Sequence, residues 1–370
     1  MEIKRVRSRY IYRFGQAQAE GDGSMGEELG GKGASLAEMT RLGLPVPPGF
    51  TISTRACRFY LEHGALPPSL EEELESALGW LESEQAQLLG GEKDPLLLSV
   101  RSGASISMPG MMDTILNVGI NDANIEGLAA KHHNVTFALD SYRRLLQMFG
   151  SVVLQVPKQA FDQASEMASR GGEEANLRQQ IASFQQVIER RSGKPFPMDP
   201  RVQLRQAVVA VFESWNNDRA RHYRRIHKTP ENSGTAVTVQ AMVFGNYGVN
   251  SGTGVGFTRN PSTGKKAMFA EFLANAQGED IVAGIRTPMP IAELERLMPK
   301  VYRKLRMVTT RLEAHYRDVQ DFEFTVQNGE LFLLQTRAAK RSPLAKLRSA
   351  VEMAEEGLIS RTDALSRVTP

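Results

Sequence analysis

Residues 320–337 read QDFEFTVQNGELFLLQTR, which is two runs of alternating apolar and polar residues joined through Asn328-Gly329. Alternation with a period of two predicts β-strands that bury one face, and an Asn-Gly pair between two such runs predicts a tight hairpin. Successive side chains of a strand point to opposite faces, so the first strand would bury one set and expose the other. The set expected to be buried is Phe322, Phe324 and Val326.

The length of the loop decides which residues of the hairpin face one another. A two-residue loop at Asn328-Gly329 would set Glu323 opposite Leu334, whereas a three-residue loop that includes Glu330 would set it opposite Gln335. Only the longer loop matches apolar residues with apolar residues, and a one-residue slip would bury charge. Three-residue loops with glycine in the left-handed conformation are common, so we predict this register. Its further pairs are Asp321 with Arg337, Phe324 with Leu334, and Val326 with Phe332.

In this register Asp321, Glu323, Gln335 and Arg337 share one face of the hairpin. Carboxylate and amide oxygens are ligands that suit Mg²⁺, and an arginine beside them can neutralise a transferring phosphoryl group. The pattern therefore predicts a site for Mg²⁺ and phosphate. The alternative is a cross-strand salt bridge on a solvated face.

A glycine-rich segment precedes the hairpin. Residues 244–264, FGNYGVNSGTGVGFTRNPSTG, contain six glycines and follow a predicted strand at 235–243. Backbone can approach a polyphosphate closely where side chains are absent, and successive N–H groups in such loops bind anions. We expect a loop that covers phosphates, and a mobile surface loop without a ligand is the alternative. The backbone of 240–243 could meet a purine ring.

Arg101 leaves a short apolar strand, 96–100, and enters the segment SGASISMPGMMDT. A guanidinium in that position suits bidentate contact with phosphate, and methionines can adapt around a ligand. The alternative is a surface loop folded onto the core.

Lys32 lies in LGGKGAS, residues 29–35. The segment matches the first part of a P-loop, but Gly33 stands where Ser or Thr would have to reach Mg²⁺, so we reject that interpretation. What remains is a glycine-rich turn that carries a lysine into a helix N-terminus, where backbone N–H groups and the helix dipole favour an anion. The alternative is a loop with a solvated lysine.

The composition is that of a globular protein: of 370 residues, 41% are hydrophobic and 24% charged. A net charge of +3 suits small anionic ligands such as nucleotides and is too weak to indicate nucleic acid. Cys57 is the only cysteine, and we expect it to be an inert packing residue in a reducing cytosol. No apolar run suits a membrane span or a signal peptide, so we expect a cytoplasmic protein. A solvated basic face is expected for Arg219, Arg221, Arg224, Arg225 and Lys228.

The order of the expected elements predicts an α+β fold, with a helical insert between two lobes that carry strands and glycine-rich loops. Ligands often bind in clefts between lobes. Helices are expected at 34–44, 55–90, 120–206, 290–317 and 342–368, and a glycine-rich loop at 16–33. Strands are expected at 1–15, 50–52, 96–100, 235–243, 255–258 and 268–273, besides the hairpin.

Nine segments between Leu29 and Arg337 together resemble pyruvate, phosphate dikinases. They are LGGKGASLAEM, GLPVPPGFTIST, SVRSGASISMPGMMDTILN, DSYRRLLQMFG, FESWNNDRA, VQAMVFGN, SGTGVGFTRNPSTG, NAQGEDIVAGIRTP and QDFEFTVQNGELFLLQTR. The resemblance implies an ATP-grasp-like nucleotide-binding domain with a helical insert lobe. The expected parts are 1–120 with 207–243 as first lobe, 121–206 as insert, 244–340 as Mg/ATP lobe, and 341–370 as a helical linker towards a missing phosphohistidine domain.

The resemblance also implies a role for each candidate residue, carried over by motif. Lys32 and Arg101 would hold ATP phosphates and act in catalysis with Arg337. Gly110 and Thr114 would line the phosphate pocket, and Gln240, Met242 and Val243 would border the adenine. The 251–264 loop, with Thr253 and Gly254, would cover the phosphates, and Glu279 would line the same cleft. Glu323 and Gln335 would bind Mg²⁺, with Asp321 in support.

The family enzyme converts ATP, phosphate and pyruvate to AMP, diphosphate and phosphoenolpyruvate through a histidine in a Gly-Gly-x-x-Ser-His-type segment. None of the six histidines here has that context, so the resemblance implies only the nucleotide half-reaction for this chain. Its implied partners are ATP, inorganic phosphate and a phosphohistidine domain in cis or in trans, within a homo-oligomeric full enzyme, with no nucleic acid and no membrane. A free-standing phosphotransferase with a small acceptor and a non-catalytic nucleotide sensor are the alternatives.

Overall fold

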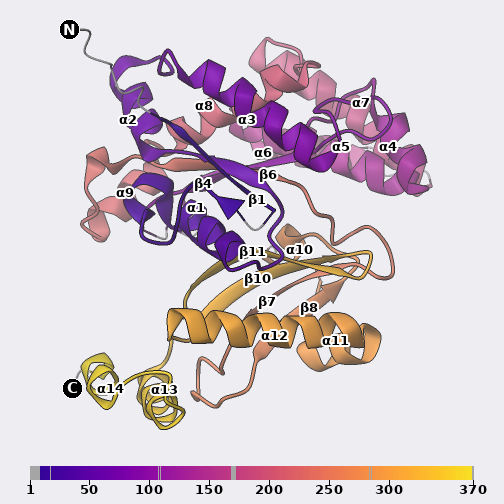
Figure 1. The fold of residues 1–370 in the computed structure, drawn as a ribbon. Helices are drawn as coiled ribbons and strands as arrows, with labels where there is room; N and C mark the ends of the chain where they lie inside the picture. The colour runs from indigo at the N-terminus through magenta and orange to yellow at the C-terminus, as the bar shows by residue number, and fades with distance from the viewer. Residues whose placement is uncertain are drawn as a thin grey trace, which may run out of the picture. The chain divides into compact units, whose positions relative to one another are not determined.

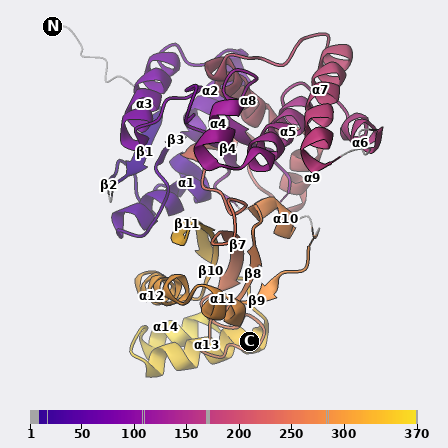
Figure 2. The same ribbon diagram turned by 90° about the vertical axis from the view of Figure 1, so that its right-hand side faces the viewer.

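The computed structural model of the chain describes residues 9–368 except 17, 107, 109, 168–171, 283 and 285. The contacts divide the chain into two compact units. Unit 1 comprises 1–41 and 48–242, and unit 2 comprises 42–47 and 243–370. Each unit contains one sheet whose strand pairs are all antiparallel, together with helices, which confirms the α+β class (Figures 1 and 2).

The sheet of unit 1 has the strand order β2-β1-β3-β6-β4-β5. Its central strand β6 is buried over all six residues, which explains its nearly unbroken run of small and apolar side chains. The strand bounds are β1 Ile11–Gly15, β2 Gln18–Ala19, β3 Gly49–Ile52, β4 Leu98–Gly103, β5 Thr114–Val118 and β6 Ala236–Ala241. Of the strand predicted at 1–15, residues 1–8 lie outside the described part.

The helical character predicted for 120–206 is confirmed. The longest stripe of buried side chains belongs to α5, which begins where the Asn134 side chain accepts a hydrogen bond from the Phe137 N–H. The helices of unit 1 are α1 Gly26–Arg41, α2 Thr54–His63, α3 Leu70–Gln85, α4 Ile125–His132, α5 Val135–Val152, α6 Lys158–Met167, α7 Glu173–Ser192, α8 Pro200–Ser214 and α9 Asp218–Ile226, with the short η1 Glu231–Ser233.

The loop predicted at 16–33 is wrong over its second half, because α1 already begins at Gly26. Glu27 and Glu28 occupy its first turn, where carboxylates stabilise the positive end of the helix dipole. The helix is interrupted at Gly30, whose φ of 66° lies outside the helical region, and then resumes. The glycine content of the segment therefore marks a break within a helix rather than a long loop.

The sheet of unit 2 has the strand order β11-β10-β7-β8-β9, and α12 lies against one of its faces (Figure 1). Its strands are β7 Gly252–Phe257, β8 Phe269–Ala274, β9 Met289–Pro290, β10 Gln320–Gln327 and β11 Glu330–Ala338. Its helices are α10 Gly278–Val282, α11 Ile291–Leu297, α12 Pro299–Tyr316, α13 Pro343–Glu355 and α14 Arg361–Arg367. The single helix predicted at 290–317 is divided at Met298, because the residue before a proline disfavours the helical conformation.

The strand predicted at 255–258 is confirmed for 255–257, but the loop predicted at 251–264 is wrong for 252–254, because the central strand β7 already begins at Gly252. Gly254 is opposite Phe324 on β10 and Phe272 on β8, and the two rings stack with centroids 6.2 Å apart. A Cβ on Gly254 would lie 2.3 Å from the Phe324 ring. Glycine is therefore required in this strand because aromatic side chains from both neighbours occupy the space above it.

Candidate functional site

In unit 1 the predicted phosphate-binding residues lie on neighbouring strands. Arg101 on β4 is opposite Thr114 on β5 and Thr238 on β6, and residues directly opposite in an antiparallel pair share a face. Gln240 lies two residues along β6 on that same face, and its Oε1 accepts a hydrogen bond from Arg101 Nη2. The structure thus brings Arg101, Thr114 and Gln240 together on one face of the sheet.

Lys32 lies beside the end of the strand that carries Arg101. A Cβ on Gly30 would lie 1.7 Å from the carbonyl oxygen of Gly103, and the Gly31 N–H donates to the Ala104 carbonyl at 2.9 Å. The start of the resumed α1 is therefore packed directly on the end of β4. The half-buried Lys32 is in the first turn after the break at Gly30, as the predicted helix N-terminus requires.

The methionines of the segment 102–114 pack onto the core. Met108 is 7% exposed in a cluster with Trp215, and Met111 and Met112 pack against the same cluster. The exposed Gly110 has a φ of 70° and no atom within 4 Å of where its Cβ would be. Ser107 and Pro109 lie outside the described residues.

In unit 2 the hairpin has a different loop from the one predicted, yet the predicted polar pairs form. The loop is the two-residue Asn328-Gly329, both with positive φ, which fits the right-handed twist of the strands. Phe324 is therefore opposite Leu333, not Leu334, and the prediction of a three-residue loop is wrong. The register then shifts at a β-bulge that leaves Leu334 without an opposite residue. Beyond the bulge Glu323 is opposite Gln335, and Asp321 is opposite Arg337.

The bulge explains how this hairpin satisfies both requirements at once. Near the turn it pairs the apolar residues on the buried face, and near the open end it pairs polar residues on the other face. Loop length alone could give only one of these two registers. The sequence contains no separate signal for the extra residue, because Leu333 and Leu334 are chemically identical.

The four polar residues at the open end of the hairpin share a face and fit a hard cation and a phosphate. Arg337 Nε donates to Asp321 Oδ2 at 2.8 Å, whereas the side chains of Glu323 and Gln335 form no hydrogen bond or ion pair with another described residue. One carboxylate and one amide oxygen therefore remain available, which fits Mg²⁺ that completes its shell with water and phosphate. Within the described part of the chain, no group of three or more His, Cys, Asp or Glu is arranged to hold a metal.

Residues of β7 and α10 lie beside this face. Thr253 is opposite Thr325 on β10, and hence on the face of Glu323 and Asp321, where its hydroxyl donates to the Phe324 carbonyl at 3.2 Å. A Cβ on Gly278, at the start of α10, would lie 3.8 Å from Thr253 Oγ1, so the start of α10 adjoins β7. Glu279 is the next residue, in the first turn of α10. Met242 and Val243 are the residues at which unit 1 ends and unit 2 continues.

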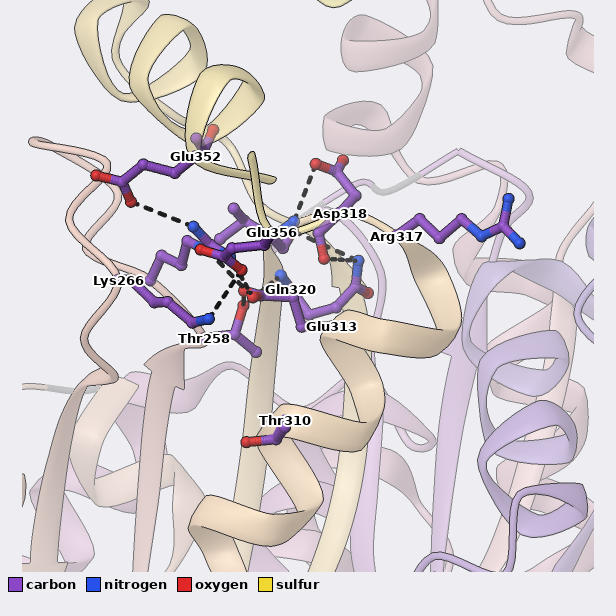
Figure 3. Close-up of polar contacts among 12 residues, drawn as sticks. Thr258, Lys266, Thr310, Glu313, Arg317, Asp318, Gln320, Glu352 and Glu356 are labelled. Carbon is purple, nitrogen blue, oxygen red and sulfur yellow. Dashed lines mark hydrogen bonds and ion pairs between the residues drawn. The ribbon is translucent and has the colours of Figure 1, made fainter. Parts of the chain in front are cut away.

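The segment TRNPSTG contributes no cation to this face. The Arg259 side chain is fully buried and donates to Glu313 on α12 at 2.8 Å and to Glu356, just after α13, at 2.7 Å. Figure 3 shows these two carboxylates. A third carboxylate, Glu352 of α13, lies 3.2 Å from Arg259 Nη1. Arg259 belongs to the segment predicted to cover phosphates. Its guanidinium is instead enclosed by carboxylates from α12 and from the region of α13.

The basic stretch of α9 also contains one buried member. Arg224 is 1% exposed, with its guanidinium carbon 4.2 Å from the centroid of the Trp215 ring and a hydrogen bond to the Trp215 carbonyl. The prediction that Arg224 belongs to a solvated face is therefore wrong, because an indole ring and a carbonyl replace water around its guanidinium. Arg219 is exposed and pairs with Asp113 at 3.1 Å.

The comparisons with known proteins define the class of the chain as an AMP/ATP-binding domain. The family model described as "Pyruvate phosphate dikinase, AMP/ATP-binding domain" matches residues 26–88, 64–296 and 289–358. The chain belongs to this family. No helix in the described part is long and apolar enough to cross a membrane.

Curated relatives are similar to this chain along nearly all of its length. The chain is 49% identical to pyruvate, phosphate dikinase of Rhizobium meliloti (strain 1021) over 98% of its own length and 43% of the relative's. It is 49% identical to pyruvate, phosphate dikinase 2 of Zea mays and 47% identical to the dikinase of Clostridium symbiosum, each over 98% of its length and 42% of theirs. The chain thus spans less than half the length of these relatives.

Proposed function

We propose that this chain is the ATP-binding part of a pyruvate, phosphate dikinase and that it binds Mg-ATP and inorganic phosphate. It transfers the β,γ-phosphoryl groups of ATP to a histidine on another domain, in cis or in trans. The full, homo-oligomeric enzyme then converts ATP, phosphate and pyruvate to AMP, diphosphate and phosphoenolpyruvate in the cytoplasm. The observation that carries the proposal is the pairing of Glu323 with Gln335 beside Asp321 and Arg337, in a chain that belongs to this family.

Within the proposed ATP-grasp-like fold, the polar residues of the hairpin have separate roles at the phosphates. Glu323 and Gln335 hold Mg²⁺, which neutralises phosphate charge, and Asp321 orients Arg337 through their 2.8 Å ion pair. Arg337 stabilises the charge that develops on the transferring group. Holding the guanidinium in place beforehand lowers the free energy of activation, because no reorganisation is needed during transfer.

The residues of unit 1 bind the rest of the nucleotide. Lys32 and Arg101 contact the phosphates, because the packing of α1 on the end of β4 places a helix start and a guanidinium at the same end of the strand. Gln240, bonded to Arg101, limits the side-chain positions that the guanidinium can take. The further proposed nucleotide contacts are Gly110 and Thr114 at the phosphates, Gln240, Met242 and Val243 at the adenine, and Thr253, Gly254 and Glu279 of unit 2.

Calorimetric titration of Mg-ATP into the whole chain tests this proposal. We expect Glu323→Gln to weaken binding in the presence of Mg²⁺ by about tenfold, since one carboxylate ligand is lost, and to make affinity less dependent on Mg²⁺. The matched control is Glu330→Gln, an exposed carboxylate at the turn of the same hairpin, which should bind as the parent does.

Each other outcome has a definite meaning. Unchanged Mg²⁺ dependence in Glu323→Gln would remove that residue from the metal site. Binding without AMP formation, even with an added phosphohistidine domain and phosphate, would favour a nucleotide sensor. ATP consumption that needs only a small acceptor would favour a free-standing phosphotransferase. Absence of Mg-ATP binding would overturn the proposal.

A further inference from the structure

A cavity in unit 2 is lined by residues that have no place in the proposed nucleotide chemistry. It has a volume of about 390 Å³ and lies where the end of α12, the connection from α12 to β10, and the two C-terminal helices meet. Its lining residues are Tyr316, Asp318, Arg341, Lys346, Ala350 and Arg367. In both views α13 and α14, which supply three of them, lie side by side (Figures 1 and 2).

The lining carries an excess of positive charge. Arg341 binds Asp318 at 2.8 Å, and Arg367 reaches the same carboxylate at 3.5 Å. Lys346 adds a third cation, while Asp318 is the one carboxylate of the lining. One carboxylate cannot neutralise three cations, so a net charge of two remains for an anion.

Part of the hydrogen-bonding capacity of these cations is unused. The Lys346 ammonium forms no hydrogen bond or ion pair with another described residue, although it can donate three hydrogen bonds. Arg341 Nε is buried and has no acceptor within the described residues. Buried donors are normally satisfied, so an acceptor atom at this position would lower the free energy of the site.

The two arginines are held in position by the surrounding backbone and side chains. Arg367 Nη1 donates to the Arg317 carbonyl at the end of α12 at 2.7 Å, and Arg341 Nη1 donates to Ser349 Oγ at 3.2 Å. The start of α14 is itself fixed by a capping box between Ser360 and Asp363. Cations that are already positioned lose little conformational entropy on binding a ligand.

We propose that this cavity binds a small phosphorylated metabolite. The guanidinium groups and the Lys346 ammonium contact its phosphate, and Tyr316 and Ala350 border its organic part. A volume of about 390 Å³ exceeds the needs of inorganic phosphate alone and lies within the range of small-molecule sites. The site is separate from the residues proposed for nucleotide binding, none of which lines it.

The test uses the whole chain and 3-phosphoglycerate as the probe. Lysines are acetylated with a limiting amount of reagent, with and without the probe, and the extent is read for each lysine by mass spectrometry. We expect protection of Lys346 and no protection of Lys300, an exposed lysine on α12 of the same unit. The measurement is repeated with saturating Mg-ATP, which should leave the protection of Lys346 unchanged.

Calorimetry with variants gives a second, independent measurement. Lys346→Glu should weaken binding of 3-phosphoglycerate by at least about tenfold, because a donor is replaced by a repelling charge. Lys346→Arg should retain binding, and Lys300→Glu, with the same change of charge, should bind as the parent does. Because the Lys346 side chain forms no hydrogen bond or ion pair among the described residues, these variants should fold.

Three results would overturn the proposal. One is equal protection of Lys300 and Lys346, which would indicate a general effect of the anion. Another is equal affinity of Lys346→Glu and the parent. The third is loss of the probe's binding in Lys32→Ala or in the presence of Mg-ATP, which would place the probe at the nucleotide site.

Discussion

Arg259 and Arg337 show how the surroundings of a guanidinium decide what it can do. The side chain of Arg259 is 0% exposed and is bound by Glu313 and Glu356, whereas that of Arg337 is 43% exposed and is bound by Asp321. A guanidinium enclosed by carboxylates directs its donors into the protein, while one on an accessible strand face can reach a phosphoryl group. This difference supports the role proposed for Arg337.

At the residue scale, Arg337→Ala should lower the rate of phosphoryl transfer much more than it lowers affinity for Mg-ATP. The charge of Arg337 matters most in the transition state, so we expect a loss in rate of about 100-fold or more with a small change in the dissociation constant. Single-turnover transfer to an added histidine domain, beside calorimetry of Mg-ATP, measures both. Arg296→Ala, an exposed arginine on α11, is the control. A loss of affinity alone would make the assigned role wrong.

Cys57 leads to a second prediction at this scale. The thiol is 0% exposed, and burial raises its pKa to about 12. The thiolate is the reactive form, so the native chain should react with a thiol reagent at neutral pH far more slowly than the unfolded chain does. Spectroscopic titration with a chromogenic disulfide, with and without denaturant, measures the difference. Rapid reaction of the native chain would contradict the expectation that Cys57 is an inert packing residue.

At the scale of elements, β7 shows that a glycine-rich sequence can be the centre of a sheet. Gly252 faces the Phe272 ring of β8 and Gly254 the Phe324 ring of β10, so the absence of side chains serves packing. Glycine costs stability in a strand interior unless something else occupies the vacated space. Here Phe272 and Phe324 occupy it, and their burial more than offsets the entropic cost of glycine.

Gly254→Ala should therefore destabilise unit 2 by about 1–3 kcal/mol, because a methyl group would force the Phe324 ring out of its position. Chemical denaturation of the parent and the variant measures the change. The matched control is Gly278→Ala in the same unit, where the added Cβ would meet only Thr253 Oγ1, at 3.8 Å. Equal loss of stability in both variants would show that the rings do not determine the effect.

The attachment of α13 to α12 depends on ion pairs and should depend on pH. Burial tends to raise the pKa of Glu356, but the hydrogen bonds and charges of Arg259 and Lys266 outweigh burial and lower it below the ordinary value of 4.5. A carboxyl whose pKa is lowered on folding stabilises the folded state above its unfolded pKa, and this contribution is lost as pH falls through the folded pKa. The contacts of α13 should therefore weaken below about pH 4.5.

Hydrogen exchange of α13 amides as a function of pH measures this weakening. We expect exchange, corrected for its intrinsic pH dependence, to rise in acid for the parent and to be less dependent on pH in Glu356→Gln. Glu355→Gln, which alters an exposed neighbouring carboxylate, should behave as the parent does. An identical pH profile in parent and Glu356→Gln would exclude Glu356 as the group responsible.

At the scale of the whole molecule, the chain spans less than half of its curated relatives, while its own matched segments cover almost all of its length. The proposed activity therefore depends on a group outside the chain. None of the six histidines follows a Gly-Gly-x-x-Ser pattern. AMP release should accordingly require a second component that supplies the acceptor.

We predict that the chain forms AMP from ATP and phosphate only when a purified phosphohistidine domain of a pyruvate, phosphate dikinase is added. Chromatographic measurement of AMP follows the reaction, and the same domain with its histidine replaced by asparagine is the control. AMP formation with that control domain would mean that the acceptor lies elsewhere. No AMP with the intact domain, despite tight binding of Mg-ATP, would favour a sensor.

Local patterns in the sequence determined the family, the helical stretch at 120–206 and the α+β class, whereas the polar pairs of the hairpin were predicted from the wrong loop length and form because of the bulge. Each of the first three rests on periodicity or on motifs within a few residues, which do not need knowledge of distant neighbours. The start of α1 and the extent of β7 were predicted less well, because glycine content was interpreted as a loop signal in both places. In each case a distant backbone or ring, at Gly103 or at Phe272 and Phe324, is what requires the glycine.

The tertiary structure alone decided the bulge at Leu334, the burial of Arg259 and Arg224, and the cationic cavity around Asp318. A bulge is chosen by the packing of both faces of a sheet, and no local pattern distinguishes Leu333 from Leu334. Arg259 is enclosed by carboxylates 54 and 97 residues away in the sequence, and Arg224 by an indole ring nine residues away. The sequence by itself therefore determined which chemical groups the protein has, and folding decided which of them meet, because the pairing of charges and the exclusion of water depend on distances in space.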